Sequence, residues 1–148
     1  MSVCALNLRQ IPIEDISVGM SASYSQTITD ADVKGFAGLS GDNNPVHMSD
    51  EYAEKSRFGR RIVHGLFSTS FFSAIFGTRL PGEGCVYVAQ SIKFLRPVYI
   101  GDTVKATVIV RSIDISKGRV FFDTICTVKN KKVITGEAEI FIPKGMVE

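Results

Sequence analysis

Residues 64–78 read HGLFSTSFFSAIFGT, and this stretch decides the fold that the sequence predicts. Its helical part, Leu66 to Thr78, is apolar on nearly every side, and a helix of that kind is normally buried. Gly77 and the pair Pro81-Gly82 end the helix. Serine and threonine residues interrupt the apolar run, which is too short and too polar to cross a membrane. We therefore expect a soluble protein with one apolar helix at its centre.

The segments after that helix favour β-structure. Four of them are rich in β-branched and aromatic residues, and short turns join most of them: residues 86–94, 103–113, 120–128 and 133–142. Before the helix, residues 24–28 indicate one more strand, Thr29 caps a helix that ends near Gly41, and Ser49 caps a short helix over residues 50–55. A buried helix lying against an antiparallel sheet makes an α+β domain. A curved antiparallel sheet around a central apolar helix is the hot-dog architecture.

The composition is that of one globular domain. The chain has 148 residues, of which 45% are hydrophobic and 22% charged, so we expect a single domain over residues 1–148 with an irregular lead-in at residues 1–20. The formal net charge of +2 gives no basic footprint for nucleic acid. Local groups of basic residues at 60–61 and 129–132 are interpreted as solvated surface.

The cysteines and the N-terminal residues bear on the compartment and on cofactors. Cys4, Cys85 and Cys126 are widely spaced, match no metal or redox pattern, and are interpreted as reduced thiols. Charged residues near the N-terminus exclude a secretory signal, so we expect a cytoplasmic protein. No dinucleotide, flavin or metal-ligand spacing is recognisable. The expected cofactor content is therefore none, with no metal, and neither nucleic acid nor a membrane is expected as a partner.

Residues 41–47 read GDNNPVH and supply the candidate chemistry. They put the carboxylate of Asp42 and the imidazole of His47 five positions apart, on a segment too rich in turn formers for regular helix. A bend of this kind can bring both groups to one small molecule, where they could share its protons. Asp42 could equally be a turn or cap residue, and His47 could simply be packed at a helix start. The chain's other histidine, His64, is interpreted as structural, with its ring hydrogen-bonded near the entrance of the apolar helix.

Three segments, taken in order, resemble the MaoC-like (R)-specific enoyl-CoA hydratases. Residues 42–47 (DNNPVH) are similar to the D-x-N-P-x-H motif of that family, and residues 62–65 resemble its I-V-H-G segment. Residues 94–98 (FLRPV), with Gly101-Asp102 behind them, resemble its third recurring segment. The resemblance covers about residues 18–143, and the length of the chain is similar to that of the short bacterial enzymes linked to polyhydroxyalkanoate synthesis.

The resemblance implies a hot-dog homodimer with an active site bounded by both subunits, no cofactor, and an enoyl-CoA or 3-hydroxyacyl-CoA substrate. It carries catalytic roles onto Asp42 and His47, and it makes the backbone N–H of Gly65 face the thioester oxygen. Ser73 takes a supporting position beside the pair, and Asn44 supports the site from within the first motif. Phe72 and Phe76 are candidate walls of an acyl pocket, although the phenylalanines of this helix are also candidates for the core.

Hydration of a trans-2-enoyl thioester requires three things: an activated water at Cβ, a proton for Cα, and stabilised negative charge on the thioester oxygen. A carboxylate and a neutral imidazole can hold one water, and a helix N-terminus beginning with glycine can approach and stabilise the oxygen. The expected activity is thus that of a lyase of fatty acid metabolism. A hot-dog thioesterase would not need the pair on one loop, and acyl-carrier-protein dehydratases take the acid from the other subunit. A non-catalytic acyl-binding module is the alternative from another class.

Overall fold

A curved six-stranded sheet is the main element of the computed structural model, which describes residues 2–3 and 9–144. Its order is β1-β2-β4-β5-β6-β3, and every pairing is antiparallel except that of β1 with β2. Register shifts occur within the β3–β6, β4–β5 and β5–β6 pairs, and such irregularities bend a sheet. The strands are β1 (Ser2–Val3), β2 (Ser21–Thr27), β3 (Val86–Phe94), β4 (Thr103–Asp114), β5 (Arg119–Val128) and β6 (Lys131–Phe141).

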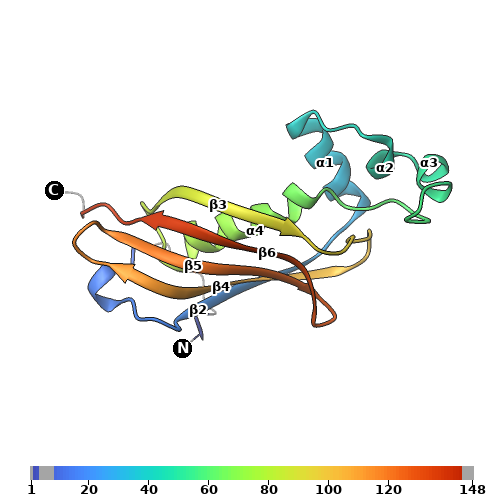
Figure 1. Cartoon of the computed structure of the whole chain (residues 1–148). Helices are drawn as coiled ribbons and strands as arrows, with labels where there is room; N and C mark the ends of the chain where they lie inside the picture. The colour runs from blue at the N-terminus through green and yellow to red at the C-terminus, as the bar shows by residue number, and fades with distance from the viewer. Residues whose placement is uncertain (1, 4–8, 145–148) are drawn as a thin grey trace.

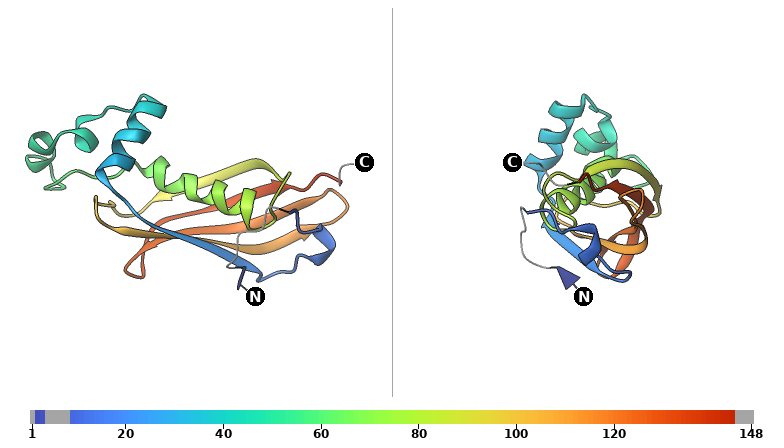
Figure 2. Two further views of the ribbon diagram at one scale, coloured as in Figure 1. Left: turned by 180° about the vertical axis from the view of Figure 1, so that it is seen from behind. Right: turned by 90° about the vertical axis from the view of Figure 1, so that its left-hand side faces the viewer.

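The apolar helix α4 (Gly65–Thr78) runs along the sheet, and the end-on view shows the sheet curving around it (Figure 2). Six of its side chains are buried, and Phe72 and Phe76 are almost wholly removed from solvent. They pack in one apolar core with inward-facing valines, isoleucines and Phe122 of the strands. This arrangement is the hot-dog architecture that the sequence predicts.

Three short helices lie together beyond one end of the sheet, near the start of α4 (Figure 1). They are α1 (Asp30–Ser40), α2 (Pro45–Met48) and α3 (Asp50–Glu54). Thr29 and Asp32 form a capping box at the start of α1, and Gly41 ends it with a φ of 79°, a conformation that glycine adopts without steric cost. Ser49 caps α3 as expected. The segment with the candidate pair therefore leaves α1 close to the N-terminus of α4.

The structure corrects three details of the sequence prediction. Residues 45–48 form a short helix where irregular turns were expected, and the lead-in at residues 1–20 contains β1 and a 3-10 turn at Ile13–Asp15. The helix α4 is not buried all round, because Ser70, Ser73 and Gly77 lie on an exposed face. Within the described residues, no helix is long and apolar enough to span a membrane.

The described cysteines agree with the expectation of reduced thiols. Cys85 and Cys126 are free, and burial raises the pKa of both, that of Cys126 to about 12. A thiol with a raised pKa is a poor nucleophile and a poor metal ligand at neutral pH. Cys4 lies outside the described residues.

Candidate functional site

Residues 42–48 fold locally through short-range hydrogen bonds. The backbone N–H of Asn44 donates to Oδ1 of Asp42 at 3.1 Å, and the N–H of Val46 donates to Oδ1 of Asn44 at 3.2 Å. Asn44 is thus the N-cap of α2, and Pro45 follows at the first helical position, where a missing N–H costs nothing. The turn formers that argued against a helix are the residues that start one. This local geometry gives Asn44 a supporting contact with Asp42.

The ring of His47 is fixed by the segment that precedes α4. Its Nδ1 donates to the carbonyl oxygen of Ile62 at 2.7 Å, and since a carbonyl can only accept, Nδ1 must carry the hydrogen. The side chain is 9% exposed. Burial lowers the pKa of His47, the nearby His64 lowers it further, and the Ile62 hydrogen bond and Asp42 oppose the change. A neutral ring of this tautomer presents Nε2 as a hydrogen-bond acceptor.

His64 lies directly against His47. The two rings stack with centroids 4.0 Å apart and an interplanar angle of 29°, and His64 is only 2% exposed. Its Nε2 donates to the carbonyl oxygen of Asp42 at 2.9 Å, whereas its Nδ1 is buried without a hydrogen-bond partner. The expectation of a ring hydrogen-bonded at the helix entrance is therefore met. The acceptor of that bond is the backbone of the candidate acid.

Asp42, His47 and His64 together form a compact group of potential ligands. One oxygen or nitrogen atom from each lies within 4.8 Å of the others. The sequence predicts that Asp42 and His47 come together, but not that His64 joins them. An imidazole nitrogen binds a metal in the plane of its ring, so two nearly parallel rings 4.0 Å apart direct their lone pairs past a shared ion. Atoms of Asp42 and His47 that lie within 4.8 Å of each other can instead hold one water molecule between a carboxylate oxygen and a ring nitrogen. The arrangement favours proton transfer over metal binding.

A cavity of about 360 Å³ opens beside this group. Asp42, His47, His64 and Gly65 line it, so the first two motifs meet at one hollow. All five residues of the third motif, residues 94–98, also line the cavity, although no role in the site was predicted for that segment. The cavity is of a size that takes a small ligand group. Its remaining walls are Arg57, Phe58, Ile62, Val63, Leu66 and Ile134.

Gly65 begins α4 at the edge of this cavity. The first N–H groups of a helix have no intrahelical acceptor, and the helix dipole favours negative charge there. A Cβ added to Gly65 would lie 2.4 Å from Cε1 of Phe94, so the Phe94 ring already rests against the glycine. Only a residue without a side chain leaves the backbone accessible at this contact.

The remaining predicted site residues lie elsewhere in the single chain. Ser73 is on the exposed face of α4 and does not line the cavity, so its supporting role stays a prediction. Phe72 and Phe76 are in the core, and the ring of Phe76 packs against Tyr87 and Phe122 at 5.1 and 4.8 Å. Neither phenylalanine lines the cavity, and their role as acyl walls also stays a prediction.

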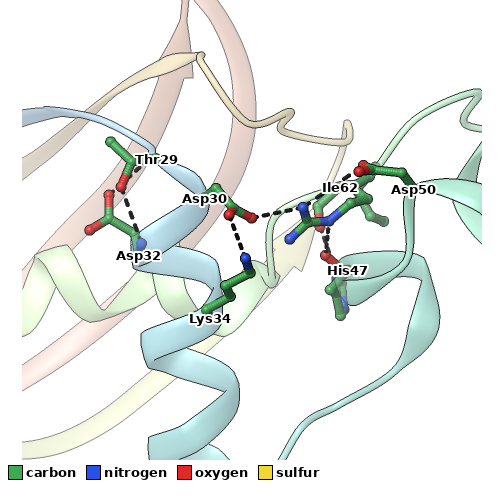
Figure 3. A network of polar contacts seen from close by, with 8 residues as sticks. Thr29, Asp30, Asp32, Lys34, His47, Asp50 and Ile62 are labelled. Atoms are coloured by element: carbon green, nitrogen blue, oxygen red, sulfur yellow. Dashed lines mark hydrogen bonds and ion pairs between the residues drawn. The ribbon is translucent and has the colours of Figure 1, made fainter.

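Arg61 is buried, so the prediction that residues 60–61 are solvated surface is wrong for this residue. Its Nε donates to the carbonyl oxygen of His47 at 2.6 Å, and its Nη1 lies 2.7 Å from Asp30 and 3.8 Å from Asp50. The ion pairs and hydrogen bonds at this junction of α1, α2 and α3 are drawn in Figure 3. Hydrogen bonds from Lys34 and Arg61 lower the pKa of Asp30. No pattern in the sequence separates Arg61 from the exposed Arg60 beside it.

Comparisons with known proteins place these features in context. A family model described as the MaoC like domain matches residues 15–137. An (R)-specific enoyl-CoA hydratase of Rhodospirillum rubrum is 52% identical over 130 residues, which cover 88% of this chain and 90% of that protein. A 3-hydroxybutyryl-CoA dehydratase of Methylorubrum extorquens is 41% identical over 93% of this chain and 87% of its own length. The solved structure of an (R)-hydratase from A. caviae involved in PHA biosynthesis matches with a TM-score of 0.85 and 37% identity, covering 88% of this chain and 99% of that one.

Proposed function

This chain belongs to the MaoC-like family, and we propose that it catalyses the (R)-specific hydration of trans-2-enoyl-CoA to (R)-3-hydroxyacyl-CoA, a reversible reaction. The observation that carries the proposal is the meeting of Asp42, His47 and the N-terminus of α4 at one cavity. These are the three chemical elements that hydration requires. The reaction runs within one domain spanning the chain and uses neither a metal nor an organic cofactor.

Asp42 and His47 share the reacting water in this proposal. Neutral His47, with Nδ1–H committed to Ile62, offers Nε2 to one hydrogen of the water, and the Asp42 carboxylate accepts the other. The pair takes one proton as the oxygen bonds to Cβ and returns one proton to Cα, so the proton count balances. The face of Cβ that the water attacks sets the configuration, and the (R) product requires the pair to hold the water over the corresponding face of the alkene.

The charge that develops on the thioester oxygen is stabilised at the start of α4. The backbone N–H of Gly65 donates to it, in a position where the helix dipole adds to the attraction. We propose coenzyme A as the carrier, as in the names of the relatives, and Arg57 and Arg96, which line the same cavity, suit its phosphates. Crotonyl-N-acetylcysteamine, which lacks those phosphates, is expected to be hydrated with a much higher KM than crotonyl-CoA. Equal KM values would contradict this choice of carrier.

We infer that the active form is a homodimer. Strand β3 is one edge of the sheet and carries exposed apolar side chains, and the exposed face of α4 is built from small residues. Unpaired apolar edges are normally covered. Val88→Lys on β3 is expected to give a monomer in light scattering, whereas Val18→Lys, at a residue 66% exposed outside the regular strands, is the matched control. A monomeric wild type with full activity would overturn this inference.

One assay separates this function from its alternatives. We expect the conjugated-enoyl absorbance of crotonyl-CoA to disappear with formation of (R)-3-hydroxybutyryl-CoA, and the rate to survive exhaustive treatment with EDTA. Release of free thiol would instead identify a thioesterase. Tight binding without either change would identify an acyl-binding module. We also propose a cytoplasmic location and a role in supplying (R)-3-hydroxyacyl-CoA for polyhydroxyalkanoate synthesis.

A further inference from the structure

We propose that Arg61 and His64 are positioning residues that hold the backbone of the catalytic pair, one carbonyl each. Arg61 Nε donates to the carbonyl oxygen of His47 at 2.6 Å, and His64 Nε2 donates to the carbonyl oxygen of Asp42 at 2.9 Å. Between them, the carbonyl oxygen of Ile62 accepts from the His47 ring at 2.7 Å. We call residues 61–64 the clasp. This inference rests on the proposed function for its kinetic consequences only.

The burial of the clasp distinguishes it from ordinary surface hydrogen bonding. Arg61 is 8% exposed and His64 is 2% exposed, so water does not replace either donor when its bond breaks. The acceptors belong to residues 42 and 47, on a loop whose other hydrogen bonds include the local turn contacts of Asp42, Asn44 and Val46 and one bond from the Ile62 N–H to the Val46 carbonyl oxygen at 3.2 Å. The long-range hydrogen bonds that hold this loop therefore come from one segment, residues 61–64, which leads into α4.

The two anchors differ in how they are themselves held. Arg61 is paired with Asp30 of α1 and lies near Asp50 of α3, so it fixes His47 relative to two neighbouring helices. His64 is packed by aromatic contact, between the ring of His47 at 4.0 Å and that of Phe36 at 4.9 Å. Its Nδ1 is buried without a hydrogen-bond partner, which costs free energy. The Nε2 bond and the stacking are what its position provides.

A shared water requires both acceptors to keep their separation. Reacting groups displaced by about 1 Å can lose about 10²-fold in rate, because the productive geometry is then rarely formed. Loosening either carbonyl anchor should thus lower kcat more than it raises KM, even where the fold remains intact. Arg61 does not line the cavity, whereas His64 contributes one of its walls.

Conservative variants test each anchor separately. Arg61→Lys keeps a positive charge for Asp30 but removes the Nε–H donor to His47. His64→Phe keeps an aromatic ring against His47 but removes the donor to Asp42, whereas His64→Gln keeps an N–H donor and removes the ring. Arg60→Lys is the matched control, because Arg60 is exposed, lies over the Tyr99 ring at 4.1 Å and does not line the cavity.

We expect kcat for crotonyl-CoA to fall about 10-fold or more in Arg61→Lys and His64→Phe, with KM within about threefold, and Arg60→Lys to match wild type. His64→Gln should recover part of the loss. Thermal unfolding measured alongside shows whether each variant is folded at the assay temperature. Unchanged kcat in folded Arg61→Lys and His64→Phe, or a loss that only follows the unfolded fraction, would overturn the proposal.

A second readout does not depend on activity. Hydrogen exchange followed by NMR reports the Nδ1–H of His47 and the amide of Asn44, which bond to Ile62 and Asp42. Arg61→Lys should accelerate exchange mainly at His47, and His64→Phe mainly at Asn44. If wild type proves inactive, the proposed function fails, and this exchange pattern alone decides the clasp. Equal hydrogen-exchange rates at these two sites in the variants and in wild type would overturn the proposal that the clasp holds the loop.

Discussion

The two ends of α4 face very different surroundings. At the N-terminal end, Gly65 follows a group of polar side chains in which His47, Arg61 and His64 each donate one hydrogen bond to a backbone carbonyl oxygen. Further along, Phe72 and Phe76 are surrounded by aromatic and aliphatic side chains of the sheet. A shift of a few tenths of an ångström matters at the first end because it changes hydrogen bonds. Around Phe72 and Phe76, the volume of the side chains matters more than their exact direction, because apolar contacts are non-directional.

This difference predicts which substitutions should affect the catalytic rate and which should affect stability. Changes at the N-terminal end should alter rate much more than stability, and changes in the middle of the helix should do the reverse. Asp42 is exposed and contributes little buried area, whereas Phe76 is 1% exposed and fills the core. The following substitutions test this separation.

The largest effect is expected for Asp42→Asn and His47→Gln. Each removes one of the two groups that we propose to hold the water, and general acid–base groups commonly contribute about 10²–10⁴-fold in rate. Hydration of crotonyl-CoA should fall by that factor in protein that is folded by circular dichroism. Glu51→Gln, at another exposed carboxylate, serves as the control. A folded variant of either residue that keeps more than about a tenth of the rate would rule out the shared-water mechanism.

Phe76→Ala should show the opposite behaviour. Removing a buried phenylalanine typically lowers the free energy of unfolding by about 3–5 kcal/mol, through lost burial and the cavity left behind. Below its melting temperature the variant should hydrate crotonyl-CoA at nearly the wild-type rate. Denaturant unfolding and initial rates on one preparation measure both quantities. A large drop in kcat without loss of stability would break the separation between the two ends.

The same variant tests the acyl-wall hypothesis. We expect wild type to prefer four- to six-carbon substrates over eight-carbon ones by about tenfold, and Phe76→Ala to narrow that gap. Ile75→Ala is the control, because Ile75 is equally buried on α4 and has no predicted role in the acyl pocket. Equal efficiency of wild type on four- and eight-carbon substrates would remove Phe76 as a gate.

Gly65→Ala should lower kcat/KM by about 10²-fold. Alanine keeps the backbone N–H, but a displaced helix start would move that donor away from the thioester oxygen, and losing one such donor typically costs about 3 kcal/mol in the barrier. The new Cβ would lie 2.4 Å from Cε1 of Phe94, so either the ring or the helix start must move. The double variant Gly65→Ala/Phe94→Ala shows which of them is responsible. Recovery of the rate there would assign the loss to the phenylalanine contact. A single variant with wild-type kcat/KM would show that the helix start accommodates a Cβ, and would remove the absence of a side chain at residue 65 as a requirement for activity.

The smallest effect concerns pH. Because burial first, and His64 second, lower the pKa of His47 below 6.5, neutral His47 should persist in the folded enzyme below that pH. The acid limb of kcat/KM should therefore have its midpoint under 6.5. Stability due to the neutral ring is complete above pH 6.5 and is lost as the pH falls through the folded pKa, because the unfolded chain binds the proton first.

Thermal unfolding of wild type and His47→Gln at several pH values checks the stability part. The melting temperature of wild type should fall more on acidification than that of the variant, and the difference should lie below pH 6.5. Parallel pH dependence in the two proteins, or an acid limb with its midpoint above 6.5, would contradict the assigned environment of His47.

Local chemistry made part of the site predictable. Asn44 and Pro45 predict a bend, and Asp42 and His47 on either side of it carry the candidate reactive groups. Gly65 lies at the predicted start of the apolar helix. Each of these signals lies within a short window of sequence. The same local signals misled for residues 45–48, because a proline and an asparagine that usually break a helix can also begin one. Arg61 and Arg60 are alike in sequence, yet only Arg61 is buried.

The sequence by itself determined the fold class, the apolar helix that packs against the sheet, and the succession of the main strands along the chain. Those features follow from periodicity, capping and β-propensity, which act over a few residues. Only the tertiary structure decided that Arg61 and His64 hold the carbonyls of His47 and Asp42, that residues 94–98 complete the cavity wall, and that Ser73 faces outward in the single chain. Contacts of that kind join residues distant along the chain, and they depend on directions that the side chains acquire only when the sheet has closed around α4.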